Sequence, residues 1–323
     1  MSAAPRLQHS PTKREALRSQ KYGNAEKPDR RSVRARSQGD PEAADDRKVI
    51  YVFGVARASC NRKTDAPRLR GIVADAPVEP LVHAGLLAFV SAVPAAQFAA
   101  REFRLAFGDM DLLKDRILAH ERVLEELSQS RDIVPFRFGT IYSDAARVLE
   151  MLARNRAELC QGLDRVRAAS EWGVKLYCDR DVLLRWTEAG SDSLRRTHDA
   201  LAHASPGIRF FLQKQHAGAC EREAAATIAS CIERSHQVLD GCAREVAEVR
   251  IQSVASHCRS ADMILNAACL VANRQLRRFR DAIATLQGEF AAHGFDYETT
   301  GPWPPYHFVS VGREGFDAAA PSR

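Results

Sequence analysis

The stretch "DMILNAACLVANRQLRRFRDAIATLQGEFAAHGFDYETTGPW", residues 262–303, decides the fold. Residues 262–272 form an apolar run of the kind that fills a buried strand. Residues 273–294 have the pattern of a helix, and Gly294 is the residue type that most often follows a helix C-terminus. Residues 295–303 alternate in polarity as a strand does. A strand, a helix and a strand in this order predict a domain of mixed helix and sheet.

Upstream of this stretch, the pattern adds two more strands and a long helical segment. We expect strands at "EWGVKLYCD" (171–179) and "VRIQSVA" (249–255), and regular helix through most of 206–250. Apolar and small residues spaced alternately four and three apart from Ile228 to Val249 make a heptad-like seam, which needs a partner helix. The order from residue 171 onward is therefore βαββαβ, the ferredoxin-like arrangement with a long helical insert.

The first half of the chain also mixes strands with helices. Strands are predicted at 48–57, 71–78, 85–93 and 132–140, and helices at 109–129 and 143–163. Pro135 cannot donate a ladder hydrogen bond, so its strand is expected at a sheet edge, at a strand start or at a bulge. His120 falls inside the apolar seam of 109–129, where a hydrogen-bonded core histidine is the expected reading.

Most of the net positive charge lies in the N-terminal segment, outside the part of the chain expected to fold. The formal net charge is +6, and residues 1–48 hold twelve Lys or Arg against seven Asp or Glu. The fold class expected is α+β in two domains, 48–167 and 168–310, between a disordered basic tail at 1–47 and a flexible tail at 311–323. Since the rest of the chain is close to neutral, nucleic-acid binding by the folded part is not favoured.

Motifs for chemistry are missing from the sequence. It contains no phosphate-binding GxxxxGK[ST], no GxGxxG after a strand and no GxSxG elbow. His198 and His203 are five residues apart and flank no carboxylate at ligand spacing, and no cysteines form a CxxC pair. We therefore expect no catalytic, cofactor-binding or metal-binding residues and no enzymatic activity. Eight cysteines without a disulfide or metal pattern fit a reducing cytoplasm, and no run is apolar enough to cross a membrane.

The segment "TTGPWPPYHFV" (299–309) is the most unusual in the chain. Prolines fix their own φ and push the preceding residue to extended geometry, so a stiff, polyproline-like arm is expected. The arm either fills a groove of its own domain or offers an aromatic anchor to a partner. The candidate partner-binding residues are Pro302, Trp303, Pro304, Pro305 and Tyr306.

Several segments together resemble one family. "TGPWPPYHFV" is similar to the terminal signature of the gas vesicle protein F/L family. Further segments agree with that family in order and spacing: "YVFGVAR", "GLLAFVSAVP", "HERVLEEL…IVPFRFGTIY", "EWGVKLY", "GIRFFLQKQ" and "ILNAACLV". The resemblance covers about residues 48–309. Cys269-Leu270 stand where the family commonly has an aromatic residue.

The resemblance implies an accessory or minor structural protein of gas vesicles, the hollow protein shells that give cells buoyancy. It implies two α+β domains, a modified ferredoxin-like one followed by a ferredoxin-like one with long helices. The expected partners are the shell protein, gas vesicle protein A, and other accessory proteins, in the cytoplasm and on the vesicle, with no small-molecule substrate. The alternative is a ferredoxin-like RNA-binding or regulatory module that uses the basic tail.

Overall fold

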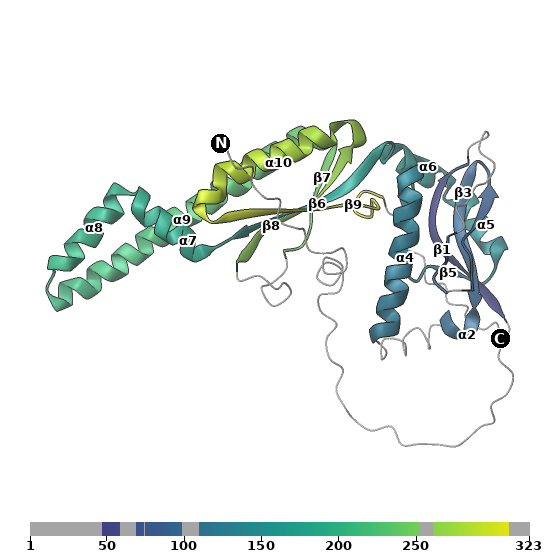
Figure 1. Ribbon diagram of the computed structural model, residues 1–323, viewed down its shortest axis with the longest axis horizontal. Coiled ribbons are helices and arrows are strands. Elements are labelled where there is room, and N and C mark those ends of the chain that lie inside the picture. Colours follow the sequence, from purple (N-terminus) through teal and green to yellow (C-terminus); the bar gives the residue numbers. More distant parts are fainter. Residues whose placement is uncertain (1–46, 59–68, 74, 99–109, 252–260, 310–323) are drawn as a thin grey trace, which may run out of the picture. The chain divides into compact units, whose positions relative to one another are not determined.

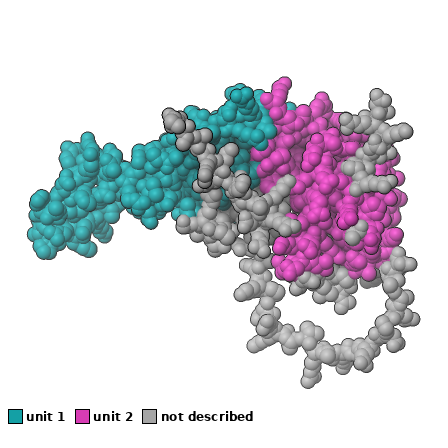
Figure 2. All heavy atoms as spheres, viewed as in Figure 1, with its two compact units in different colours: residues 1–37, 173–269, 275–300 teal, residues 38–172, 270–274, 301–323 magenta. Residues whose placement is uncertain are grey.

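The computed structural model describes residues 47–58, 69–73, 75–98, 110–251 and 261–309 (Figure 1). The described residues belong to two compact units, coloured separately in Figure 2. The N-terminal unit comprises residues within 38–172, 270–274 and 301–323, and the helical unit comprises 173–269 and 275–300. Residues 301–309, which we expected in the second domain, thus group with the N-terminal unit. The two expected tails, 1–47 and 311–323, lie outside the described residues except for Arg47.

An antiparallel sheet forms the centre of the N-terminal unit. It contains β1 (Lys48–Arg57), β2 (Glu79–His83), β3 (Leu86–Pro94) and β4 (Val134–Pro135) in the order β2-β3-β1-β4, and β5 (Ile141–Tyr142) also pairs with β1. The β2–β3 turn has positive φ at both Ala84 (48°) and Gly85 (81°), as a two-residue hairpin requires. Pro135 lies in the edge strand β4, which confirms the expected edge position.

Among the described residues, four helices accompany this sheet. They are α2 (Ala95–Phe98), α4 (Met110–Ser130), α5 (Ala145–Arg154) and α6 (Arg156–Arg165). The helix expected at 109–129 is confirmed as α4, which runs along one face of the sheet (Figure 1). The helix expected at 143–163 is instead two helices that meet at Asn155. The Asp144 side chain caps the first of them by accepting from the Arg147 amide.

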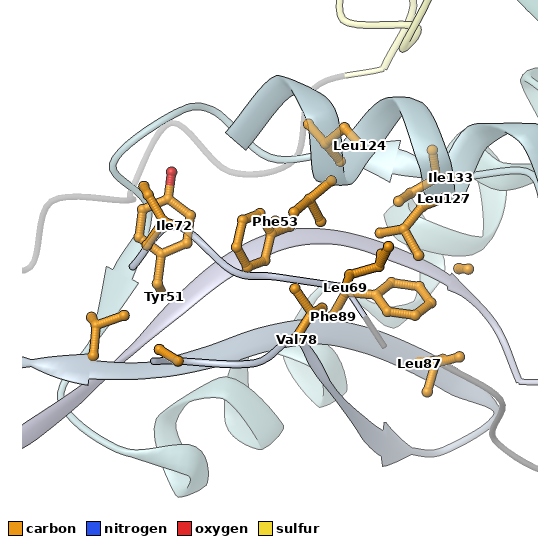
Figure 3. Close-up of a cluster of buried hydrophobic side chains, with 14 of the residues drawn as sticks. Tyr51, Phe53, Leu69, Ile72, Val78, Leu87, Phe89, Leu124, Leu127 and Ile133 are labelled. Atoms are coloured by element: carbon orange, nitrogen blue, oxygen red, sulfur yellow. The ribbon is translucent and has the colours of Figure 1, made fainter. Parts of the chain in front are cut away.

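The core of the N-terminal unit lies between the sheet and α4. Aromatic side chains from β1 and β3 (Tyr51, Phe53 and Phe89) pack with Leu124 and Leu127 of α4, and all are fully buried (Figure 3). The register of β1 against β3 shifts between Val52 and Gly54, which is the mark of a β-bulge.

Residues 71–78 do not form the strand that we predicted. Of these, residues 71–73 and 75–78 are described and belong to a tight loop with an isolated bridge between Arg70 and Pro77, and the second strand begins only at Glu79. The Gly71 amide donates to the Ala76 carbonyl oxygen over 3.1 Å. A Cβ at Gly71 would lie 2.1 Å from that oxygen, so the loop can close only around a glycine. Apolar content suggested a strand here, but the close turn and Pro77, which has no amide proton, prevent a ladder.

The helical unit takes its name from four helices: α7 (Arg180–Gly190), α8 (Asp192–His203), α9 (Pro206–Cys242) and α10 (Leu276–Phe290). Short 3₁₀ turns, Asn273–Gln275 and Ala291–His293, flank α10. The helix expected through 206–250 therefore stops at Cys242. The predicted seam is buried at Ser235, Leu239 and Cys242, but Val246 lies in the next strand and Val249 beyond it.

A second sheet contains β6 (Ala169–Cys178), β7 (Glu245–Glu248), β8 (Asp262–Ala272) and β9 (Phe295–Trp303), in the order β7-β8-β6-β9. The strand expected at 249–255 is wrong for residues 249–251, and residues 252–255 lie outside the described part. The helix and strands expected from 262 to 303 are confirmed, and Gly294 has the left-handed φ of +87° that follows a helix end.

Side chains of α9 and β9 are joined by hydrogen bonds. The Ser235 hydroxyl donates to the Cys231 carbonyl oxygen over 2.7 Å, so the Tyr297 hydroxyl, 2.6 Å away, must donate to Ser235 Oγ. Burial raises the pKa of the Tyr297 hydroxyl. A polar contact thus fixes the last half of α9 against the sheet.

Candidate partner-binding surfaces

The proline-rich segment does not run as a stiff arm beyond Trp303. After β9 ends, the chain turns at residues 306–308, and the amides of Phe308 and Val309 both lie 3.3 Å from the Pro305 carbonyl oxygen. Pro304, Pro305, Phe308 and Val309 are buried within the N-terminal unit. The chain therefore departs from the expected extended arm at the turn of residues 306–308.

Tyr306 joins a chain of hydrogen bonds that runs through the core histidine. The Gly139 amide donates to the Tyr51 hydroxyl (3.1 Å), which lies 2.9 Å from His120 Nδ1. On the other side, His120 Nε2 lies 3.1 Å from the Tyr306 hydroxyl, which donates to Glu121 Oε1 (3.2 Å).

The proton positions on His120 follow from both ends of this chain. Tyr51 already accepts from an amide and has one proton to give, so it donates to Nδ1. Tyr306 gives its proton to a carboxylate, so it accepts from the Nε2 proton. Both ends assign the neutral imidazole with its proton on Nε2, and His120 has no exposed surface. It is a hydrogen-bonded core histidine, as the sequence predicted.

A second polar contact holds the turn from its other side. Glu171 is 4% exposed and accepts from the His307 amide over 2.9 Å, and its other oxygen lies 2.6 Å from His307 Nδ1. Three of the predicted partner-binding residues, Pro304, Pro305 and Tyr306, are therefore engaged inside the chain's own N-terminal unit. Pro302 is exposed and Trp303 half-buried, and their contact with a partner stays a prediction.

The start of α9 presents an apolar ridge, formed by Ile208, Phe210 and Phe211. Their exposed fractions are 59%, 72% and 69%. Residues 200–220 contain Arg209 and Lys214 but no Asp or Glu. In the sequence this stretch stood out only for its resemblance to the family. The Phe-Phe pair could have indicated an exposed surface, because neighbours on a helix point about 100° apart and cannot both enter a narrow buried stripe.

Residues 49–310 match the family model "Gas vesicle synthesis protein GvpL/GvpF". The chain is 28% identical to gas vesicle protein L of Streptomyces sp. (strain CB03234), over 74% of this chain and 85% of that protein. It is 30% identical to gas vesicle protein F of the same strain, over 80% and 98%.

The crystal structure of the gas vesicle protein GvpF from Anabaena sp. PCC7120 superposes with a TM-score of 0.60 at 18% identity, covering 82% of this chain and 99% of that one. This likeness shows a shared fold of mixed helix and sheet. In the described residues, no helix is both long and apolar enough to span a bilayer. The match over residues 49–310 shows that the chain belongs to the gas vesicle GvpL/GvpF family.

Proposed function

We propose that this protein takes part in gas vesicle assembly by binding the vesicle's shell protein, and other gas vesicle proteins, through the apolar ridge of α9. Family membership supports the assembly role. The observation that carries the binding proposal is the exposure of Phe210 and Phe211 side by side on a helix. Clustered exposed aromatic side chains are typical of surfaces that bind other proteins.

The physical need for such a surface comes from the shell itself. A subunit that borders a gas-filled space must carry apolar surface, and before polymerisation that surface would aggregate in water. An accessory protein can cover it by laying an apolar helix face into a groove. Because residues 200–220 contain Arg209 and Lys214 but no Asp or Glu, we expect the partner's contact surface to be apolar with acidic residues at its rim.

Co-elution of the purified protein with the shell protein tests the proposal. The double variant Phe210→Ser with Phe211→Ser should lose co-elution and should no longer keep the shell protein soluble. The matched control is Val82→Ser in the N-terminal unit, which changes another apolar side chain of 50% exposure. If the double variant co-elutes as the wild type does, or if the Val82 variant loses co-elution equally, the ridge is not the docking surface.

We further infer that the protein acts without catalysing a reaction, in the cytoplasm and at the vesicle, with no small-molecule substrate. The resemblance and the family support this reading, since both describe gas vesicle proteins.

We also infer a ferredoxin-like arrangement for residues 168–310. The element order of one strand, helices, two strands, a helix and a strand supports it, together with the sheet order β7-β8-β6-β9. In this arrangement α7, α8 and α9 form the long helical insert between the first two strands.

A further inference from the structure

Three helices of the helical unit bring two histidines and a glutamate together. Glu188 lies near the end of α7, His198 in the middle of α8 and His216 in α9. Glu188 Oε1 is 2.7 Å from His198 Nδ1 and 3.5 Å from His216 Nε2. One donor atom from each residue lies within 4.8 Å of both others. We call these three residues the His-Glu cluster.

An ordinary ion pair between His198 and Glu188 accounts for only part of this geometry. His216 Nε2 is buried and makes no hydrogen bond with any described residue, and its 3.5 Å separation from Glu188 is too long for a good one. Its side chain is 13% exposed, against 65% for His198. A buried ring nitrogen of this kind has lost its hydrogen bonds to water, and no hydrogen bond within the protein replaces them. Such a nitrogen needs an explanation.

A metal ion would supply the missing partner. Two imidazole nitrogens and one carboxylate oxygen are a donor set that Zn²⁺ takes, with a water molecule in the fourth position. Ligands about 2.0–2.1 Å from one tetrahedral ion lie about 3.3 Å apart. The separation between Glu188 and His216 already fits. The separation between Glu188 and His198 is 2.7 Å and would have to widen by about 0.6 Å, which the exposed His198 ring can do.

We propose that the His-Glu cluster binds a divalent ion of the Zn²⁺ type and thereby cross-links α7, α8 and α9. The cysteine one helical turn beyond His216 is not a fourth ligand, because the Cys220 thiol points to the Leu184 carbonyl oxygen at 3.7 Å. Burial also raises the pKa of that thiol. From the sequence we expected no metal site at His198 and His203. The cluster has no linear signal, because Glu188 and His216 are ten and eighteen residues from His198 and come together only when three helices pack.

Calorimetric titration of the full-length, chelator-treated protein with Zn²⁺ tests the proposal. We expect the wild type to bind about one equivalent in this cluster, and His216→Gln and Glu188→Gln each to weaken that binding about tenfold or more. His203→Ala removes an exposed histidine from α8, the helix that carries His198, and should leave the binding unchanged. Absence of binding by the wild type, equal binding by the two cluster variants, or an equal loss in the His203 variant would each overturn the proposal.

Cobalt(II) provides a second readout that separates this cluster from binding at cysteines. Co²⁺ in the His-Glu cluster should give visible d–d bands without the near-ultraviolet thiolate charge-transfer band. Thiolate bands in the wild type, or visible bands that survive in His216→Gln, contradict the assignment. Circular dichroism identifies a variant that fails to fold. If His216→Gln fails to fold, the metal binding of Glu188→Gln, which changes a carboxylate to an amide of the same size, decides whether the cluster is the site.

Discussion

His120 illustrates how a residue with catalytic potential can serve the fold. Its two nitrogens lie between Tyr51 and Tyr306, which come from the opposite ends of the described chain, and the direction of every hydrogen bond is fixed by an amide at one end and a carboxylate at the other. The ring is stacked on Phe53 with centroids 5.7 Å apart. A histidine held in this way orients its neighbours and has no free nitrogen for a substrate.

Replacing Tyr306 with phenylalanine removes one hydroxyl from this chain. The His120 Nε2 proton and the Glu121 carboxylate both lose a partner in a buried place, so we expect a loss of about 1–2 kcal/mol in the free energy of unfolding. Urea denaturation measures this free energy. Tyr142→Phe is the control, since its half-buried hydroxyl makes no hydrogen bond with a described residue. An equal loss in the control would show that the hydrogen bonds of Tyr306 add nothing to the stability.

Cysteine reactivity should differ sharply between positions. Burial, followed by the nearby Asp262 carboxylate, raises the pKa of the Cys178 thiol to about 11. A raised pKa leaves about one molecule in a thousand as thiolate at pH 8, and only the thiolate attacks. Alkylation at pH 8 followed by peptide mapping should therefore modify the half-exposed Cys160 long before Cys178. Equal rates in the folded protein would contradict this.

At the scale of the element, the β-bulge in β1 depends on Gly54. A Cβ at this position would lie 2.8 Å from both the Val134 carbonyl oxygen and the Ile133 side chain. Gly54→Ala should destabilise the protein by about 1–3 kcal/mol, because backbone cannot give way as a flexible side chain does. Gly288→Ala is the matched control in the last turn of α10, where nothing lies within 4 Å. It should stabilise by about 0.5–1 kcal/mol. Thermal denaturation of both variants compares them.

Helix α7 depends on Asp179, the N-cap residue just before its first turn. Asp179 accepts from the Val182 amide over 3.0 Å and so caps the helix that carries Glu188. Asp179→Ala should lower the free energy of unfolding by about 1 kcal/mol, and Asp179→Asn should restore most of it, since asparagine caps almost equally well. Chemical denaturation measures both. An asparagine variant as unstable as the alanine variant would assign the effect to charge instead of capping.

The sequence predicted elements well where periodicity was long and less well where a few contacts decide. Helix α4 and the elements of 262–303 follow from repeating apolar spacing. Residues 71–78 have enough apolar content for a strand, but a close backbone approach at Gly71 puts the described residues of this range in a loop. The apolar spacing predicted α9 correctly up to Cys242 but did not predict where the helix ends, because spacing alone does not show that a strand begins at Glu245.

The candidate sites were less predictable for a related reason. The proline-rich segment was recognised from its composition, but its turn into the N-terminal unit depends on Glu171 and His120, which are remote in sequence. The His-Glu cluster has no linear pattern, since each member comes from a different helix. Such sites arise from tertiary packing, and a single sequence contains no spacing rule for that.

At the scale of the whole molecule, the N-terminal unit is assembled from both ends of the described chain. Phe308 and Val309 are 3% and 7% exposed there. A chain that stops at Gly301 loses their burial and that of two prolines. We expect this to cost the unit about 3 kcal/mol or more. Hydrogen exchange should accelerate in the amides of β1. A chain that stops at Val309 is the control and should exchange like the full-length protein; equal exchange in both truncated chains would contradict the prediction.

The contribution of residues 304–309 to the N-terminal unit has a consequence for biosynthesis. The sheet and helices of this unit are complete in sequence once Trp172 has been synthesised. The segment that begins at Gly301 follows only after more than a hundred further residues, which takes on the order of ten seconds at ordinary rates of translation. During that interval the nascent unit lacks its last buried side chains and exposes the places where they dock. Chaperones and proteases can therefore distinguish an interrupted polypeptide from a finished one by this uncovered docking surface alone.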